Sequence, residues 1–280
     1  MEIRHLAASQ DGDFIAAAAF ESEVEIWDLK NLSVIARFAT RLDFGGRRLS
    51  IDRTGTILLV GNYENGVSCY SVPSGREIWH RRDLRKVQQC TVLPSNDRAA
   101  VAIEGKPAQI VRTDDGVTVE VVPNAKRLFY FEDGVFAVES TKHLRVCKDQ
   151  TVSRIPKETF AILCLSRIGE SLAVGYSGGP LQRLEPETGK VHWSHRLAGR
   201  HVLRTSPSLP DGLLYGIDWN YSQGSKYALK AWDWETGRTR TIKLLDGPTF
   251  EFVKNGNLLV CSDRRFIQCA DGKVIGSVAL

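Results

Sequence analysis

Short apolar runs alternate with polar residues along the whole chain, and turn-forming residues separate these runs at regular intervals. In Leu181–Leu197 (LQRLEPETGKVHWSHRL), one strand-like run precedes a turn built on Pro186 and Gly189, and a second strand-like run follows it. Alternation with a period of two is typical of half-buried β-strands, and Pro and Gly mark the tight turns between them. The stretch therefore predicts a β-hairpin.

The same pattern returns elsewhere in the chain. In Val67–Arg82, Pro73 and Gly75 form the turn, and Trp79 takes the position that Trp193 has in the first hairpin. Weaker copies occupy Leu229–Leu245 and Val24–Ala39. A repeat of roughly 40 residues that contains several strands and no helix predicts a stack of similar small sheets.

The chain divides into seven such units of four short strands. The expected units span residues 3–40, 47–83, 87–123, 125–157, 159–197, 201–245 and 249–280. A lone four-stranded sheet leaves apolar faces in water, whereas sheets packed face to face in a ring bury both faces. We therefore predict an all-β fold, a seven-bladed β-propeller of four-stranded antiparallel blades that forms a single domain over residues 1–280. Each blade is expected to be contiguous in sequence, with no strand exchanged between the termini.

Two kinds of motif resemble known propeller families. VEIWDL at Val24–Leu29 and LKAWDW at Leu229–Trp234 resemble the strand ends of WD40 repeats. ETGKVHW at Glu187–Trp193 and SGREIW at Ser74–Trp79 are similar to the turn-plus-tryptophan signature of quinoprotein-type propellers. No G-H dipeptide opens any unit, so the resemblance indicates the propeller superfamily and no subfamily. It implies binding without chemistry, because WD40-like propellers mostly serve as interaction platforms.

Four tryptophans of these motifs are expected to anchor the structure. They are Trp27, Trp79, Trp193 and Trp232. A buried tryptophan removes a large apolar area from water, which suits packing between blades. We therefore assign them to the core and not to a cofactor site.

Charge and cysteine usage narrow the function classes. The net charge of +4 and the pI of about 8.7 allow an acidic partner, whereas nucleic-acid binding usually requires a more strongly basic domain. No apolar run is long enough to span a bilayer, and no signal-peptide core follows Met1. The six cysteines lack C-x-x-C spacing, which is typical of buried, reduced thiols. We expect a cytoplasmic protein without membrane association, disulfides or a zinc site.

Two motifs that could indicate chemistry have a plainer interpretation. GYSGG at Gly175–Gly179 matches the G-x-S-x-G of hydrolases, but a strand-like run follows it where the nucleophile elbow needs a helix. His192 and His195 are three residues apart on one predicted strand, so they face opposite sides and cannot chelate one metal. We expect no catalytic residue, no metal and no cofactor.

The expected binding surface follows from the topology. One end of a propeller carries the connections between blades and the hairpins between the two middle strands of each blade. We call this end the connection face, and the other end the turn face. Exposed aromatic and basic side chains carry most interface energy, and they gather in predicted loops of the connection face, above all in an extra loop at Trp219–Tyr227. The candidate partner-binding residues are Arg41, Phe44, Arg82, Arg85, Lys86, Arg200, His201, Trp219, Tyr221, Lys226 and Tyr227.

These observations predict a non-catalytic, monomeric propeller that binds a protein partner and occludes or scaffolds it. An acidic partner fits the basic surface, and a bacterial immunity protein that neutralises a toxin, another inhibitor or an adaptor are the roles that we favour. The alternative is an enzyme or small-molecule binder that uses the central channel, as lactonase-like and quinoprotein-like propellers do. Acidic or metal-binding residues at the starts of the inner strands would favour it, and Ile3, Val87 and Ala125 do not. Nucleic-acid binding is a third option, which a steep salt dependence would reveal.

Overall fold

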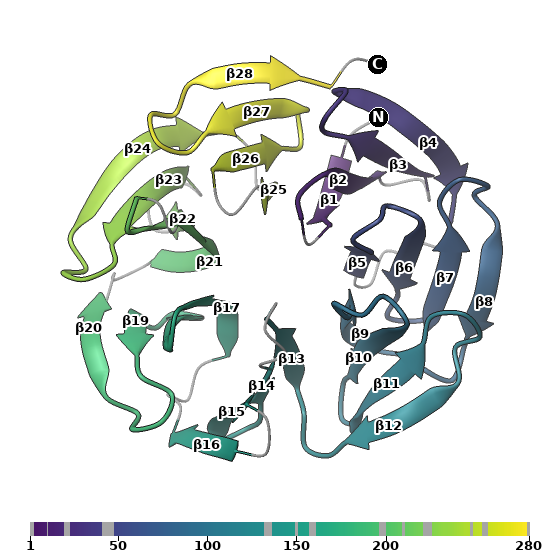
Figure 1. The fold of residues 1–280 in the computed structure, drawn as a ribbon, viewed down its shortest axis with the longest axis horizontal. Helices are drawn as coiled ribbons and strands as arrows, with labels where there is room; N and C mark the ends of the chain where they lie inside the picture. Colours follow the sequence, from purple (N-terminus) through teal and green to yellow (C-terminus); the bar gives the residue numbers. More distant parts are fainter. Residues whose placement is uncertain are drawn as a thin grey trace.

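The chain forms a closed ring of small sheets in the computed structural model (Figure 1). The structure describes residues 3–9, 11–19, 23–40, 48–131, 136–148, 151–156, 161–195, 200–208, 211–220, 226–246, 249–253 and 257–278. These residues contain strands β1 to β28 and no helix, arranged in seven four-stranded antiparallel sheets. The predicted seven-bladed β-propeller is confirmed.

The strands of the first four blades follow one another in chain order. Blade 1 contains β1 (Ile3–Ala8), β2 (Phe14–Ala19), β3 (Glu23–Asp28) and β4 (Ser33–Ala39). Blade 2 contains β5 (Arg48–Ile51), β6 (Ile57–Gly61), β7 (Val67–Ser71) and β8 (Glu77–Arg81). Blade 3 contains β9 (Val87–Val92), β10 (Arg98–Ile103), β11 (Ala108–Arg112) and β12 (Thr118–Val122). Blade 4 contains β13 (Arg127–Tyr130), β14 (Phe136–Glu139), β15 (His143–Lys148) and β16 (Thr151–Pro156).

The last three blades repeat this order. Blade 5 contains β17 (Ile162–Ile168), β18 (Ser171–Tyr176), β19 (Leu181–Leu184) and β20 (Val191–His195). Blade 6 contains β21 (Arg200–Ser208), β22 (Leu213–Asn220), β23 (Lys226–Asp233) and β24 (Thr239–Leu245). Blade 7 contains β25 (Phe250–Val253), β26 (Leu258–Cys261), β27 (Arg265–Gln268) and β28 (Val274–Ser277).

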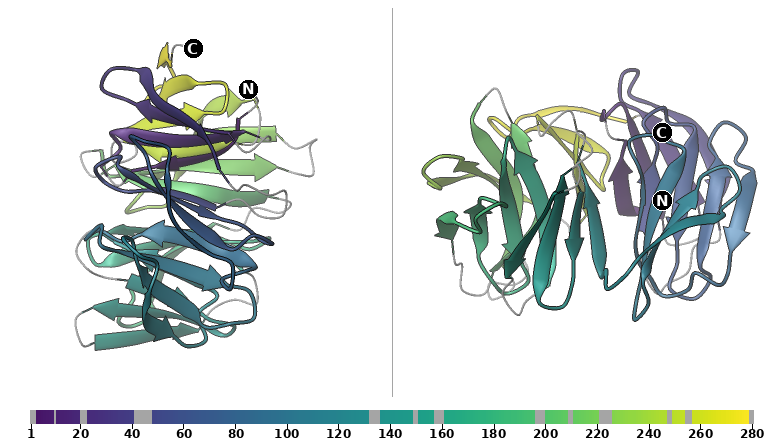
Figure 2. Two further views of the ribbon diagram at one scale, coloured as in Figure 1. Left: turned by 90° about the vertical axis from the view of Figure 1, so that its right-hand side faces the viewer. Right: turned by 60° about the horizontal axis from the view of Figure 1, so that its bottom comes forward.

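Each blade consists of four consecutive strands, with the first nearest the centre of the ring and the fourth at the rim (Figure 1). No strand is exchanged between the termini in the described part of the chain, as predicted. The strands run between the two ends of the ring, so the loops gather at these ends (Figure 2). Inter-blade connections and middle hairpins therefore share one end, the connection face.

Apolar packing between neighbouring blades holds the ring together. One cluster of buried apolar side chains fills each of the seven interfaces, including the one between blades 7 and 1. Both faces of a middle strand are covered, so β6 is buried from Leu58 to Gly61, whereas the rim strand β12 is largely exposed. The burial pattern explains why middle strands read as continuous apolar runs and rim strands alternate.

Two tryptophans of the repeated motif dock on the next blade. Trp79 donates from Nε1 to the carbonyl oxygen of Thr113 at 2.8 Å, and its ring covers Gly116. Trp193 donates in the same way to Trp234 at 2.8 Å and covers Gly237. Both glycines have positive φ, which favours glycine, and an added Cβ would meet the indole at 2.8 Å. Backbone conformation and close packing therefore both require glycine at these turns.

The other two tryptophans that we expected to be anchors, Trp27 and Trp232, are completely buried, and Trp79 is 9% exposed. Trp193 is partly exposed at the rim. The tryptophans are thus structural. In each of the two docks, the tryptophan of one blade covers the turn glycine of the next blade.

The interface between blades 4 and 5 lacks this dock. Strand β16 contains no aromatic residue, and a Cβ added at Gly189 of the following blade would meet nothing within 4 Å. A cavity of about 410 Å³ lies there, lined by Ile155, Pro156, Tyr176, Gln182, Leu184, Gly189 and Val191. Blade 4 therefore packs less completely at the rim than blades 2 and 5 do.

A buried ion cluster joins blade 7 to blade 1. Glu25 is 1% exposed and pairs with Arg264 at 2.7 Å and with Arg37 at 2.6 Å. The indole of Trp27 donates to Glu25 at 3.0 Å, and the Arg264 guanidinium lies 5.4 Å from the centre of that indole ring. Burial alone would raise the pKa of Glu25, but these hydrogen bonds outweigh it, so the pKa is lowered. The ion cluster therefore joins blades 7 and 1 in addition to the apolar cluster between them.

Candidate functional site

An aromatic ladder crosses blade 6 at the connection face. His201, Trp219 and Tyr227 are direct cross-strand partners on β21, β22 and β23. The rings of His201 and Trp219 stack with centroids 5.3 Å apart, and those of Trp219 and Tyr227 stack at 6.2 Å. Phe250 of blade 7 continues the row at 5.8 Å from Tyr227. The three ladder rings are partly exposed, although Nε1 of Trp219 is buried.

The predicted extra loop at Trp219–Tyr227 is wrong in extent. Trp219 lies within β22, and Lys226 and Tyr227 begin β23, so only residues 221–225 separate the two strands. Trp and Tyr have high β-propensity, and here cross-strand stacking extends the ladder by several residues beyond the usual hairpin. The aromatic side chains therefore pack between blades 6 and 7 and are not free in a loop.

The GYSGG motif supports this ladder from the neighbouring blade. It forms the turn between β18 and β19, as predicted, and contains no helix. The backbone N–H of Gly178 donates to Nδ1 of His201 at 2.7 Å. Because Nδ1 accepts, the neutral imidazole carries its proton on Nε2, on the other side of the ring. The motif thus positions a ladder residue and not a nucleophile.

The basic residues between blades 2 and 3 form a second surface. Arg82, Arg85 and Lys86 are exposed, while Leu84 among them is 1% exposed and fixes the connection to the core. The Lys86 ammonium lies 6.0 Å from the ring centre of Tyr63. This surface lies across the ring from the blade 6 ladder (Figure 1), so the structure does not bring the two groups into one compact site.

The remaining candidates cannot be placed in either group. Arg41, Phe44 and Tyr221 lie outside the described residues. Arg200 is the first residue of β21, beside His201, but its side chain is not among those described. Lys226 is exposed at the end of the ladder.

Three arginines at the inner strands were missed in the sequence. Arg48 and Arg127 are the first residues of β5 and β13, and Arg204 lies in β21. Each reaches the inner strand of the next blade: Arg48 donates to the Gln88 carbonyl and Arg127 to that of Ile162, while Arg204 pairs with Glu251 at 3.2 Å. The expectation for the inner strands concerns acidic and metal-binding residues at other strand starts, so it does not cover these arginines.

Two carboxylates accompany these arginines, because Arg127 also lies 4.0 Å from the buried Glu139 and Arg204 pairs with Glu251. Burial lowers the pKa of Arg48, and the charges of Arg127 and Arg204 lower it further. Burial also raises the pKa of Glu251, although Arg204 opposes that effect. The arginines at the inner strands could attract an anionic group to the centre of the ring.

The residues weighed for metal or thiol chemistry have structural surroundings. Among the described residues, no group of three His, Cys, Asp or Glu side chains could hold a metal ion. His192 is exposed, whereas His195 contacts the Gly237 carbonyl. All six cysteines are free, and burial raises the pKa of Cys90 to about 12. The described part of the chain also contains no helix suited to crossing a membrane.

Fold and repeats together define a β-propeller of the WD40 and quinoprotein-like type. The family model described as outer membrane protein assembly factor BamB matches residues 11–202, which is more than half of the chain. The chain belongs to this family.

Known proteins share the fold at low sequence identity. Mouse (Mus musculus) transducin-like enhancer protein 2 is 24% identical over 106 residues, which cover 38% of this chain but only 14% of that protein. The β-propeller domain of Myceliophteria thermophila Cps50 (Swd1) superposes with a TM-score of 0.70 at 18% identity, covering 99% of this chain and 97% of that one. Kuenenia stuttgartiensis hydrazine synthase gives 0.68 at 13% identity and covers 99% and 96%. The WD40 repeats of RRP9 give 0.69 at 13% identity and cover 92% and 86%.

Proposed function

We propose that this propeller is a non-catalytic interaction protein that binds an acidic segment of a protein partner across its connection face. The observation that carries the proposal is the partly exposed ladder of His201, Trp219 and Tyr227, which ends at the exposed Lys226. Aromatic rings held by cross-strand stacking lose little entropy on binding, and a cation beside them favours a carboxylate.

The arginines of the inner strands extend this surface toward the centre of the ring. A partner segment that lies on the ladder can place acidic side chains near Arg204, whose side chain is 50% exposed although it pairs with Glu251. The exposed cations of the blade 2 to 3 connection, Arg82 and Arg85, would guide the approach from the other side. The partner would thus cover much of the connection face.

The biological role that we propose is scaffolding or occlusion of the partner by a monomeric ring. The family description names an assembly factor, and one of the structural neighbours is named for its WD40 repeats, which supports an adaptor. Occlusion of a toxin by an immunity-type protein is the narrower form of the same proposal. Six free thiols, five of them buried, favour a reducing compartment such as the cytoplasm.

The test compares charge reversal on the two faces. Lys226→Glu with Arg82→Glu alters the connection face, and Arg76→Glu with Arg238→Glu alters exposed arginines on the turn face. Proteins retained from a lysate by each immobilised variant and by the wild type are quantified by mass spectrometry. We expect a partner whose retention falls at least tenfold for the connection-face variant and is unchanged for the turn-face variant. Equal retention by all three proteins would contradict the proposal.

The second candidate function is binding of a small anion in the central channel, and the three channel arginines favour it. Arg48→Gln would then abolish saturable binding of a tricarboxylate such as citrate while leaving partner retention unchanged. Loss of partner retention without any citrate binding would instead support the protein-interaction proposal.

A further inference from the structure

A pair of arginines in blade 4 lies directly opposite one another without acidic partners. Arg145 on β15 and Arg154 on β16 are cross-strand partners, so their side chains leave the sheet on the same side. Like charges in this position destabilise a sheet. Among the described residues, no carboxylate lies within 4.0 Å of either guanidinium. Within the described part of the chain, the repulsion between the two guanidinium groups is therefore not compensated by a carboxylate.

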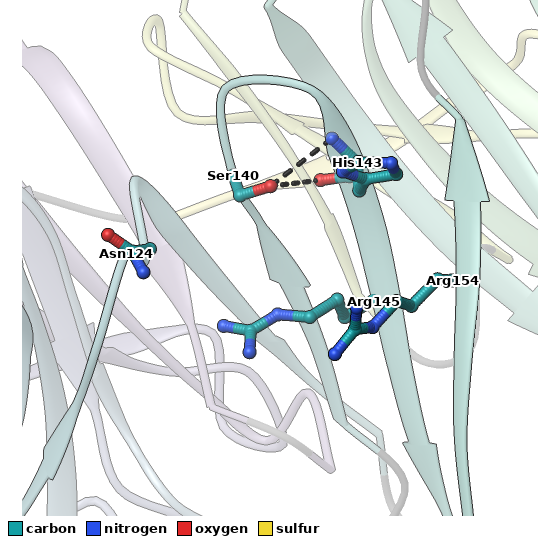
Figure 3. A pocket seen from close by; sticks show the side chains of 5 residues that line it. All are labelled: Asn124, Ser140, His143, Arg145 and Arg154. Carbon is teal, nitrogen blue, oxygen red and sulfur yellow. Dashed lines mark hydrogen bonds between the residues drawn. The ribbon is translucent and has the colours of Figure 1, made fainter.

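The two side chains line a cavity of about 190 Å³ together with Asn124, Ser140 and His143. Figure 3 shows both guanidinium groups on the same side of the sheet, with Arg145 reaching further toward Asn124. Arg145 donates from Nη2 to the Pro123 carbonyl at 3.1 Å, which holds the group in place. Its Nε is buried and has no hydrogen-bond partner, an unsatisfied donor of a kind that is costly in a folded protein.

The wall of the cavity is preorganised. The Ser140 hydroxyl donates to the His143 carbonyl at 2.9 Å and accepts from the His143 N–H at 3.2 Å, which fixes the hairpin between β14 and β15 (Figure 3). Asn124 has a positive φ of 57°, so the connection from blade 3 turns sharply at this point. Rigid polar groups around two guanidinium groups form a site that loses little entropy when a ligand binds.

We propose that this cavity binds the phosphate group of a phosphate monoester. Two guanidinium groups match the charge of about −2 that such a group carries near pH 7, and its three terminal oxygens can accept from both arginines and from the Asn124 amide. A carboxylate has one charge and two oxygens, so it would leave one arginine uncompensated. The site goes beyond the proposed partner surface and does not depend on it.

The experiment is a calorimetric titration of inorganic phosphate into the whole protein, with sulfate and chloride at equal ionic strength as comparisons. Wild type should bind phosphate saturably, and Arg154→Gln should weaken the affinity by about 10- to 100-fold, because one charge-assisted hydrogen-bonding group is lost. Arg98→Gln is the matched control. It changes one member of another cross-strand arginine pair that has aspartate partners, and it should leave the phosphate affinity unchanged.

A second variant keeps the proposal open to refutation if Arg154→Gln folds poorly. Asn124→Asp places a carboxylate in the cavity, and Asp tolerates the positive φ at that position. This variant should lose the phosphate response and unfold at a higher temperature than wild type in the absence of phosphate. The proposal is overturned if phosphate stabilises wild type no more than sodium chloride of equal ionic strength, or if both pocket variants retain the wild-type affinity.

The source of the phosphate group is distinguished by two further titrations. Free phosphoserine and a peptide containing phosphoserine present the same monoester, and both should compete with inorganic phosphate. Affinity of the peptide at least tenfold above that of phosphoserine would assign the group to a modified protein, and equal affinities would assign it to a small metabolite. If neither phosphoserine nor the peptide competes with inorganic phosphate, the assignment of the ligand as a phosphate monoester is contradicted.

Discussion

Two cross-strand pairs of arginines in neighbouring blades have opposite surroundings. In blade 3, Arg98 lies opposite Arg112, and each has an aspartate: Asp97 is 3.7 Å from Arg98, and Asp114 is 3.5 Å from Arg112. In blade 4, Arg145 and Arg154 form a cross-strand pair between the third and fourth strands, and this pair has no such partner among the described residues. The same repulsive arrangement is therefore neutralised within the fold in one blade and left for an external anion in the next.

The difference follows from the two ends of the ring. Turns between strands use aspartate because its carboxylate accepts backbone N–H groups. Asp52 accepts from the N–H groups of Thr56 and Ile57 at 2.7 Å each, and Asp233 accepts from that of Thr236 at 2.7 Å. The turn face thus acquires negative charge as a by-product of turn chemistry, and this charge neutralises nearby arginines.

The largest expected effect concerns the buried ion cluster around Glu25. Glu25→Ala leaves the buried Arg264 without its carboxylate and should lower the free energy of unfolding by about 3 to 5 kcal/mol, measured by urea denaturation. The control is Glu235→Ala. It removes an ion pair with Arg183 of similar length, 2.8 Å, but its carboxylate is 75% exposed, so the loss should stay below about 1 kcal/mol. Equal losses would mean that ring closure does not rest on this cluster.

The next effect separates docking from backbone strain on the turn face. Gly116 and Gly189 have nearly the same φ, 72° and 71°, but only Gly116 lies against a tryptophan. Gly189→Ala should cost about 1 kcal/mol from the left-handed backbone alone, and Gly116→Ala about 3 kcal/mol because Trp79 must also move. Chemical denaturation of both variants measures the difference. A smaller loss for Gly116→Ala than for Gly189→Ala would show that the dock does not stabilise the ring.

Acid should weaken the ring closure. The pKa of Glu25 in the folded protein lies below its ordinary value of 4.5. The stabilisation from ionised Glu25 is therefore complete above that ordinary value and is lost as the pH falls through the lowered pKa. Urea denaturation from pH 7 to pH 3 should show a flatter acid limb for Glu25→Gln than for wild type. Parallel curves would show that another carboxyl group controls acid unfolding.

The smallest effect sharpens the comparison of the two arginine pairs. Without phosphate, Arg154→Thr should raise the free energy of unfolding by up to about 1 kcal/mol, because it removes an uncompensated cross-strand repulsion. Arg98→Thr should not stabilise the protein, because Asp97 then loses its neighbour. Thermal unfolding at low salt measures both. Stabilisation by Arg98→Thr alone would reverse the interpretation.

The fold could be predicted from the sequence because each blade is local. Alternation, turn residues and repeated tryptophans define hairpins within about 40 residues, and stacking them requires no knowledge of distant contacts. The Arg145–Arg154 pair was also within reach, since the short separation of Lys148 and Thr151, which pair with each other, sets the register of β15 against β16. The contact of Glu25 with Arg264 was not, because it joins the first blade to the last and depends on ring closure.

The candidate site was predicted less completely. The sequence does not distinguish partly exposed aromatics in a loop from aromatics at the end of a long hairpin. For Trp219 and Tyr227, only the stacking across neighbouring strands in the structure shows that they belong to the hairpin. The arginines of the inner strands escape a criterion that asks only for acidic and metal-binding residues. Basic residues at strand starts, such as Arg48, were the available signal.

The most direct test of the account is the affinity of the retained partner for the two charge-reversed proteins, measured by calorimetry from low to physiological salt. The account predicts that Lys226→Glu with Arg82→Glu lowers the affinity at least tenfold and flattens its salt dependence, while Arg76→Glu with Arg238→Glu changes neither. Equal loss in both proteins, or a loss confined to the turn-face variant, would contradict the assignment of recognition to the connection face.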